Sequence, residues 1–198
     1  MKNSKSLLLA VLLVGFTSSA AMAEEGKVYA AIDLGRGSAA DFCEGVPAGL
    51  SCNDTTTAYR FGLGYQVNKN VGVEAGYLDA GKVNVSGTYL GVPVSAAATM
   101  SGFQLSAIGS VPISNEFALL GKAGIALIDG KRTYSEPGYS ESANYSNSNF
   151  TFGFGARFKA NDKIAIRAMF EDFGTIKVAS YDPGSKVTML SAGLEVGF

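Results

Sequence analysis

Residues 150–158 read Phe150-Thr151-Phe152-Gly153-Phe154-Gly155-Ala156-Arg157-Phe158, and every second position is apolar. In an extended chain these apolar side chains would share one face, opposite the face that carries Thr151, the two glycines and Arg157. Strict alternation over this length predicts a β-strand with a wide apolar face and a narrow polar one. The charge therefore lies on the face that has little room, which is unusual for a strand of a soluble protein.

Seven other segments have a similar pattern and a similar length. They lie at about Val28–Leu34, Thr57–Val67, Val71–Asp79, Thr99–Val111, Phe117–Ile128, Ile164–Phe173 and Leu190–Phe198. Each is near the 9–11 residues that a tilted strand needs to cross a bilayer. After the N-terminal segment, no apolar run approaches the roughly 20 residues of a membrane-spanning helix, which excludes a helical membrane protein.

The connections between these eight segments alternate between short and long. Three are short: Asn68–Asn70, Pro112–Glu116 and Ala160–Lys163. Four are longer and polar, at about Arg36–Thr56, Ala80–Ala98, Gly130–Asn149 and Gly174–Lys186. Short turns on one side and longer loops on the other are typical of outer-membrane barrels, whose termini lie on the periplasmic side. We expect an all-β protein: an eight-stranded antiparallel up-and-down transmembrane β-barrel.

The narrow faces of the segments carry four acidic and four basic residues among glycines and small polar side chains. These are Asp33, Arg60, Glu74, Lys122, Arg157, Arg167, Glu171 and Glu195. An eight-stranded barrel has an interior just wide enough for side chains to fill it. Equal numbers of acids and bases suit such an interior, because a buried charge without a partner is costly. A soluble, lipocalin-like barrel would show the reverse, with an apolar interior and a charged exterior.

The first 23 residues have the form of a secretory signal peptide. Lys2 and Lys5 make a basic start, an apolar run follows, and Ala21-Met22-Ala23 provides a small-x-small cleavage site. A buried N-terminal helix would not explain the basic start and the small-residue end together. We therefore expect residues 1–23 to be removed on export and residues 24–198 to form the mature barrel domain.

Composition excludes several classes of function. The net charge is −1 and basic clusters are absent, so there is no electrostatic case for binding nucleic acid. Cys43 and Cys52 are the only cysteines; in an exported protein they predict a disulfide, and the chain has no histidine to complete a metal site with them. Without histidine the usual general base near neutral pH is missing. We expect no cofactor, no metal and no enzymatic activity.

The segment from Gly64 to Tyr77 resembles the second hairpin of the OmpA-like outer-membrane barrels, and looser matches extend over the mature chain. The resemblance implies that Glu74 and Arg167 form a lumen ion pair that blocks the barrel, and that Lys122 occupies a basic lumen position. The sequence departs from the family pattern at two lumen positions. Ile108 stands where a lysine is expected and Arg157 where a glutamate is familiar, so the resemblance implies that a second lumen pair is missing.

The last strand ends in a pattern that resembles the signal by which the barrel-assembly machinery recognises its clients. Its residues are Ser191, Gly193, Val196 and Phe198. A strand with an apolar face can pair with another β-edge while the barrel closes. The resemblance thus implies that the assembly machinery is a partner during biogenesis.

Three functional hypotheses follow from the sequence. The first is a monomeric outer-membrane protein in contact with membrane lipids and lipopolysaccharide, with a closed, salt-bridged lumen and long extracellular loops that serve adhesion or envelope integrity. The second is a narrow porin-like channel for small solutes. The third is a soluble periplasmic binding barrel. Conductance separates the first two hypotheses, and extraction behaviour separates both from the third.

Overall fold

The computed structural model describes residues 26–177 and 184–198, so the expected signal peptide at residues 1–23 lies outside the described residues. The chain forms strands and turns. The strands are β1 (Lys27–Ala40), β2 (Leu50–Asn53), β3 (Thr55–Gln66), β4 (Val71–Tyr89), β5 (Val92–Pro112), β6 (Phe117–Glu136), β7 (Tyr139–Lys159), β8 (Ile164–Ile176) and β9 (Ser185–Gly197). No helix in these ranges is long and apolar enough to cross a membrane.

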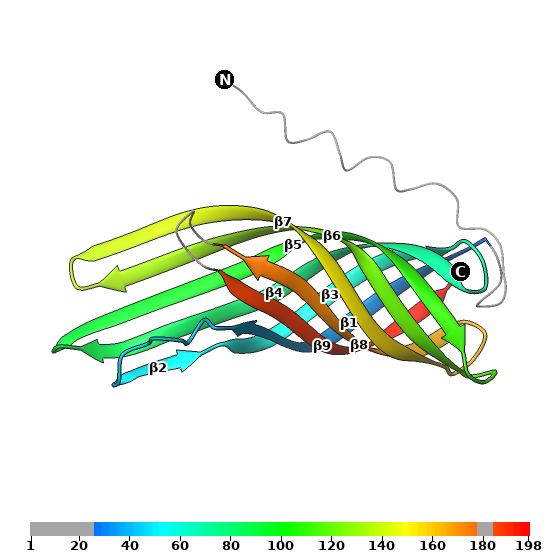
Figure 1. Cartoon of the computed structure of the whole chain (residues 1–198), viewed down its shortest axis with the longest axis horizontal. Coiled ribbons are helices and arrows are strands. Elements are labelled where there is room, and N and C mark those ends of the chain that lie inside the picture. Colours follow the sequence, from blue (N-terminus) through cyan, green and yellow to red (C-terminus); the bar gives the residue numbers. More distant parts are fainter. Residues whose placement is uncertain (1–25, 178–183) are drawn as a thin grey trace, which may run out of the picture.

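Eight of these strands close into an antiparallel ring (Figure 1). The order is β4-β3-β1-β9-β8-β7-β6-β5, and the pairing of β4 with β5 closes the ring. Because β1 pairs with both β3 and β9, the first and last strands are neighbours. The expected eight-stranded up-and-down barrel is confirmed. The ninth strand, β2, is a short addition that pairs with the distal part of β4 outside the ring.

The wide apolar face of each strand points outward. Aromatic and aliphatic side chains that are exposed on the barrel wall include Ile32, Phe61, Leu63, Phe103, Leu105, Ile125, Phe150, Phe152, Phe154 and Leu190. In water such a continuous apolar surface would be unfavourable, whereas a hydrocarbon environment suits it. The ring also pairs the backbone of neighbouring strands, which a lipid environment requires.

The three short turns share one construction. In each turn, one side-chain oxygen accepts hydrogen bonds from the backbone N–H groups two and three residues further along. The acceptors are Asn68 Oδ1, Ser114 Oγ and Asn161 Oδ1. Asn and Ser favour turns because their short side chains can make this local bond. The expected short connections are therefore confirmed, and they lie at the same end of the barrel as the C-terminus (Figure 1).

Two of the expected long loops are mostly strand, which corrects the sequence-based boundaries. β4 and β5 continue through Ala80–Ala98 to a turn at Leu90 and Gly91, and β6 and β7 continue through Gly130–Asn149 to a turn at Pro137 and Gly138. In β4 a bulge between Asp79 and Gly81 shifts the register, and Gly81 has φ +74°. The bulge inverts the inside–outside alternation, and this hides the rest of the strand from a period-two pattern.

These long strands form a sheet that continues beyond the barrel wall, here called the projecting sheet. It contains the distal halves of β4, β5, β6 and β7, with β2 added at the β4 edge. β7 pairs with β8 only from Phe152 to Lys159, so its distal half has left the ring. Figure 1 shows both hairpins reaching past the ends of β8 and β9, on the side away from the C-terminus.

The connection from β1 to β3 carries the expected disulfide. Cys43 and Cys52 are bonded, and Cys52 belongs to β2, which pairs with Asn84–Gly87 of β4. The connection is shorter than expected, because β1 runs to Ala40 and β3 begins at Thr55. The disulfide therefore holds a small loop against the β4 edge of the projecting sheet.

Replacing Cys43 and Cys52 by serine should loosen this loop and leave the barrel folded. Closing a loop of this size is worth about 2.5 kcal/mol in the chain-entropy model. Glu44 is exposed between the two cysteines, so a glutamate-specific protease should cut the double variant there faster than the oxidised protein. The other exposed glutamates, such as Glu141, provide the internal control. Equal cutting at Glu44 in both proteins would show that β2 pairing alone holds the loop.

Candidate functional site

The interior of the barrel is the candidate site, and all eight charged residues expected in the lumen lie there. Asp33 is on β1, Arg60 on β3, Glu74 on β4, Lys122 on β6, Arg157 on β7, Arg167 and Glu171 on β8, and Glu195 on β9. Seven of them are buried. Arg157 is the exception, because 18% of its side chain remains exposed. Seven different strands of the ring thus contribute charged groups to one central layer.

Arg167 is the central cation of this layer. Its Nε and Nη2 atoms donate to the two carboxylate oxygens of Asp33 at 2.7 and 2.6 Å. Its Nη1 atom donates to Glu74 at 2.7 Å and to Glu195 at 3.3 Å. The Glu74–Arg167 contact is the one implied by the family resemblance. Arg167 also engages Asp33 with a forked, two-bond geometry, and such charge-assisted pairs are the strong ones.

Arg60 also donates two hydrogen bonds to Asp33, and both go to the same carboxylate oxygen. Its Nε and Nη2 atoms lie 3.0 and 2.8 Å from the Oδ2 atom of Asp33. Its Nη1 atom donates to Glu171 and, at 3.4 Å, to Gln104. Asp33 therefore lies between two guanidinium groups, and Arg60 connects it to Glu171 on β8.

Lys122 completes the layer from the opposite wall. Its Nζ atom lies 3.0 Å from Glu74, 2.9 Å from Glu171 and 2.9 Å from the amide oxygen of Gln104. Arg157 lies 3.5 Å from Glu195. Each of the four carboxylates thus has at least one cation within ion-pair distance. Paired in this way they can act as structural groups, and none stands apart as a candidate general base.

Sequence reasoning missed two uncharged members of the layer. The hydroxyl of Tyr29 donates to Glu74 at 3.2 Å, and the amide nitrogen of Gln104 donates to Thr151 at 3.1 Å. The signal for Tyr29 was present, because it lies four residues before Asp33 and so on the same face of β1. Its ring lies against Gly64 on β3, where an added Cβ would be 2.0 Å from the ring.

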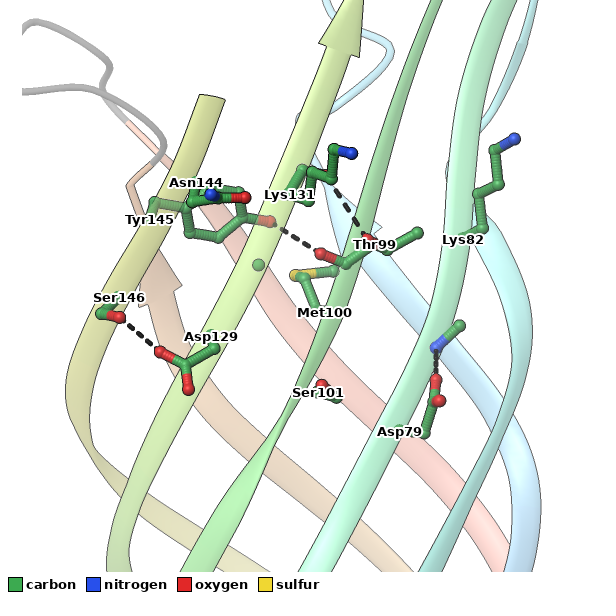
Figure 2. A pocket seen from close by; sticks show the side chains of 12 residues that line it. Asp79, Lys82, Thr99, Met100, Ser101, Asp129, Lys131, Asn144, Tyr145 and Ser146 are labelled. Atoms are coloured by element: carbon green, nitrogen blue, oxygen red, sulfur yellow. Dashed lines mark hydrogen bonds between the residues drawn. The ribbon is translucent and has the colours of Figure 1, made fainter. Parts of the chain in front are cut away.

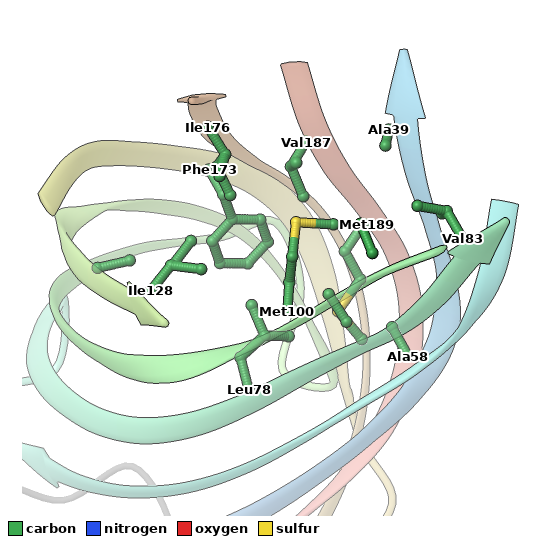
Figure 3. Close-up of a cluster of buried hydrophobic side chains, with 13 residues drawn as sticks. Ala39, Ala58, Leu78, Val83, Met100, Ile128, Phe173, Ile176, Val187 and Met189 are labelled. Atoms are coloured by element: carbon green, nitrogen blue, oxygen red, sulfur yellow. The ribbon is translucent and has the colours of Figure 1, made fainter. Parts of the chain in front are cut away.

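The structure places an apolar layer beside the charged one, towards the projecting sheet. Figure 3 shows Phe173, Met100 and Met189 pointing towards one another from β8, β5 and β9, with Ile128 and Leu78 beside them. All belong to one buried cluster, and Phe173 is completely buried. The sequence pattern predicted only charges and small residues in the lumen, so this layer was missed. It fills the interior with side chains that offer nothing to water or ions.

The two departures from the family pattern have different surroundings. Ile108 is buried with Leu120 and Met169 in a second, smaller apolar cluster. Arg157 turns to Glu195, and both line a cavity of about 200 Å³ at the end of the lumen near the short turns. Tyr29 lines the same cavity. Ile108 therefore takes part in no ion pair, as the resemblance implied. Glu171 nevertheless forms ion pairs with Arg60 and Lys122, which adds to the pairs around Glu74.

The residues of the expected assembly signal lie on β9. Ser191 is buried, while Val196 and Phe198 are exposed on the outer wall. An added Cβ at Gly193 would lie 2.2 Å from Asp33, so the glycine makes room for a lumen carboxylate. In the folded barrel β9 is paired on both sides, with β1 and β8. The role of these residues in assembly stays a prediction.

A polar hollow of about 680 Å³ lies on strands β4 to β7 at the base of the projecting sheet (Figure 2). Its residues follow the register in rows. The row of Asp79, Ser101 and Asp129 comes directly after the apolar row of Tyr77, Phe103 and Leu127, and the row of Lys82, Thr99 and Lys131 comes next. In Figure 2 the two lysines lie on the side of the hollow away from the two aspartates.

None of the described residues forms a group of three or more acidic or cysteine side chains placed to hold a metal ion. The lumen charges contact one another through ion pairs and hydrogen bonds between strands. The charged layer fixes the positions of seven strands relative to one another, and the apolar layer fills the space above it.

Comparison with known proteins gives one family. The model of the OmpA-like transmembrane domain matches residues 23–198. Among solved structures, Ail, the attachment invasion locus protein of Yersinia pestis, has a TM-score of 0.55 and 17% identity, covering 89% of this chain and 100% of Ail. The outer-membrane protein OprG from Pseudomonas aeruginosa has a TM-score of 0.52 and 13% identity, covering 87% of this chain and 96% of OprG. Neisserial surface protein A has a TM-score of 0.51 and 14% identity, covering 86% of this chain and 97% of that protein. At these identities the likeness is one of fold. None of the curated proteins matches the sequence.

Removing one partner from the charged layer should destabilise the barrel strongly. Glu74→Ala leaves Arg167 and Lys122 short of a counter-charge, and broken buried pairs cost about 3–5 kcal/mol. Arg167→Ala should lower the free energy of unfolding by less in the Glu74→Ala variant than in the parent protein. The difference between these two losses, the coupling energy of the pair, should be at least about 1 kcal/mol. Urea unfolding in lipid vesicles measures these differences.

Arg157→Ala is the matched control for this cycle, because it removes a lumen cation with one long ion pair and a partly exposed side chain. It should cost at most about 1 kcal/mol. Strictly additive losses for the Glu74 and Arg167 changes would contradict the pairing.

Proposed function

The chain belongs to the family of OmpA-like transmembrane domains, and we propose that it serves as a sealed outer-membrane anchor that presents a rigid sheet for contact outside the cell. Its place is the outer membrane, as the family and the apolar outer wall indicate. The observation that carries the proposal is that the lumen is filled with side chains while four strands of the same barrel continue well beyond it. The third hypothesis, a soluble periplasmic barrel, is excluded by the family and by this apolar wall.

Two layers support the closed lumen. Ions crossing the barrel would have to break the contacts of Arg167, Arg60 and Lys122, and then pass a cluster built around Phe173. Opening the charged layer strands buried charges, and wetting the apolar layer hydrates side chains that gain nothing from water. The narrow channel is therefore the weaker of the two remaining hypotheses.

The projecting sheet supports the role in contact. With both termini and the short turns on the periplasmic side, the hairpins of β4–β5 and β6–β7 would stand outside the cell. Ail, whose name describes attachment and invasion, shares the fold at 17% identity. That likeness concerns fold alone, so the proposal rests on the sheet itself. It is a non-enzymatic role, since the lumen carboxylates are paired with cations.

The polar hollow supports contact with lipopolysaccharide. Lys82 and Lys131 stand two rows beyond the last apolar row of the wall, the level at which phosphate groups would follow the acyl chains. Lysine is a common point-charge partner of phosphate. Export through a cleaved signal peptide and recognition of the β9 pattern by the barrel-assembly machinery belong to the same proposal, as does a monomeric barrel.

Planar-bilayer recording separates the anchor from the channel. The refolded, inserted protein should give no conductance steps at any salt concentration. The Glu74→Ala, Arg167→Ala double variant should stay silent as well, because the apolar layer around Phe173 remains in place. Steady small steps from the parent protein would make it a diffusion channel. Steps from the double variant alone would show that the charged layer is the only seal.

Shortening the projecting sheet tests its role in contact. Val83 faces Ala98 and Lys131 faces Asn144, so an Asn-Gly turn can replace residues 84–97 and 132–143. Expressed in a non-adherent bacterial host, the full chain should raise adhesion to cultured epithelial cells at least about tenfold more than the shortened form. Equal surface levels and equal urea midpoints are the controls. Equal adhesion of both forms would rule out contact through the sheet.

A further inference from the structure

The distal half of the β4–β5 hairpin is uncharged and ends in apolar side chains. No Asp, Glu, Lys or Arg occurs between Lys82 and Glu116. At the tip, Tyr89, Leu90 and Val92 are 45, 87 and 42% exposed. Figure 1 shows this turn at the end of the sheet farthest from the C-terminus. An apolar tip on a hairpin half without any charged residue is unusual for a segment that stands in water.

The turn itself is built in an unfavourable way. Tyr89 pairs with Val92, and the two residues between them have positive φ, +49° at Leu90 and +81° at Gly91. A two-residue turn of this kind favours Asn followed by Gly, because Asn tolerates the left-handed region. Leucine does so poorly. The chain therefore keeps an exposed apolar side chain at a position where a polar one would fit the backbone better, which points to function.

The second hairpin of the same sheet has a different tip. There the hydroxyls of Tyr134 and Tyr139 donate to Glu136 and Glu141, and both carboxylates are at the surface. The apolar character is thus a property of the β4–β5 tip alone and not of the projecting sheet as a whole. The second hairpin provides a control position on the same scaffold.

We propose that Tyr89, Leu90 and Val92 form an anchor that enters the interface of a phospholipid bilayer opposite the cell. The inference deepens the proposed function and rests on it, because the sheet must face outward. Three features favour lipid over a protein groove. The hairpin has no charge to desolvate, its ladder pairs most of its backbone, and tyrosine suits the membrane interface. Three side chains are also too few for a specific protein interface.

The chemistry predicts which bilayers bind. Insertion driven by apolar side chains needs no anionic lipid and changes little with salt. The carboxylates Glu136 and Glu141 on the neighbouring hairpin would be repelled by an anionic surface. Zwitterionic phosphatidylcholine vesicles are therefore the probe of choice. One tip binds weakly, and many copies on a cell surface would bind together by multivalency.

The chain contains no tryptophan, so a single substitution gives a local fluorescent reporter. Tyr89→Trp places it in the anchor, and Tyr139→Trp places it at the control tip. The full chain is held in nanodiscs and mixed with phosphatidylcholine vesicles, with or without brominated acyl chains. We expect a blue shift and bromine quenching for Tyr89→Trp only. Equal responses from the two reporters would overturn the proposal.

Leu90→Asn, added to the Tyr89→Trp reporter, separates binding from folding. Asparagine should improve the turn, so the urea midpoint should stay equal or rise. Loss of the leucine side chain that would insert into the vesicle membrane should weaken vesicle partitioning roughly 10- to 100-fold. Unchanged partitioning would contradict the anchor. If the protein did not bind vesicles but its adhesion to cells still depended on Leu90, the partner would be a protein. This result would overturn the lipid anchor and leave the proposed function standing.

Discussion

The charged contacts of Arg167 hold the interior together, and much of the sequence is arranged around them. From β8 its guanidinium reaches carboxylates on β1, β4 and β9, of which only β9 is a neighbouring strand. A buried cation needs such partners, and each partner needs space. Glycine provides it: a Cβ at Gly193 would meet Asp33, and one at Gly62 would lie 3.2 Å from Glu74. The glycines of the narrow faces are thus part of the ion network.

The lumen changes character along its length, and this change decides what the barrel can do. Fully paired charges lie in the middle, and the cluster around Phe173 lies towards the projecting sheet. A charged layer alone can rearrange, since side chains exchange partners. An apolar layer has no alternative partners for a passing ion, so it closes the pathway by a separate mechanism. Because both the charged layer and the apolar layer fill the interior, the surfaces left for function are the outer wall and the projecting sheet.

Alternation in the sequence was sufficient to predict the ring, because in Phe150–Phe158 one face meets lipid and the other meets the lumen. It also placed Glu74 and Arg167 inside. It failed where that contrast ends. Beyond the bilayer both faces of a strand meet water, which removes the contrast along the distal halves of β4 to β7. In β4 the bulge at Gly81 also shifts the register, so these strands appeared shorter than they are. The Phe173 cluster was missed for a related reason: Leu78 and Phe173 come soon after the inward charges Glu74 and Glu171 on their strands, where polarity was expected to continue.

The extension of strands in place of loops has a consequence for recognition. A flexible loop must lose conformational entropy when it binds, whereas a paired hairpin has already lost it on folding. The disulfide between Cys43 and Cys52 and the pairing of β2 with β4 add further restraint at the β4 edge of the sheet. The acidic tip at Glu136 and the apolar tip at Leu90 are therefore held at fixed positions on one scaffold. Two contacts of different chemistry can then be made at once without additional ordering, provided that the barrel below them stays closed and rigid.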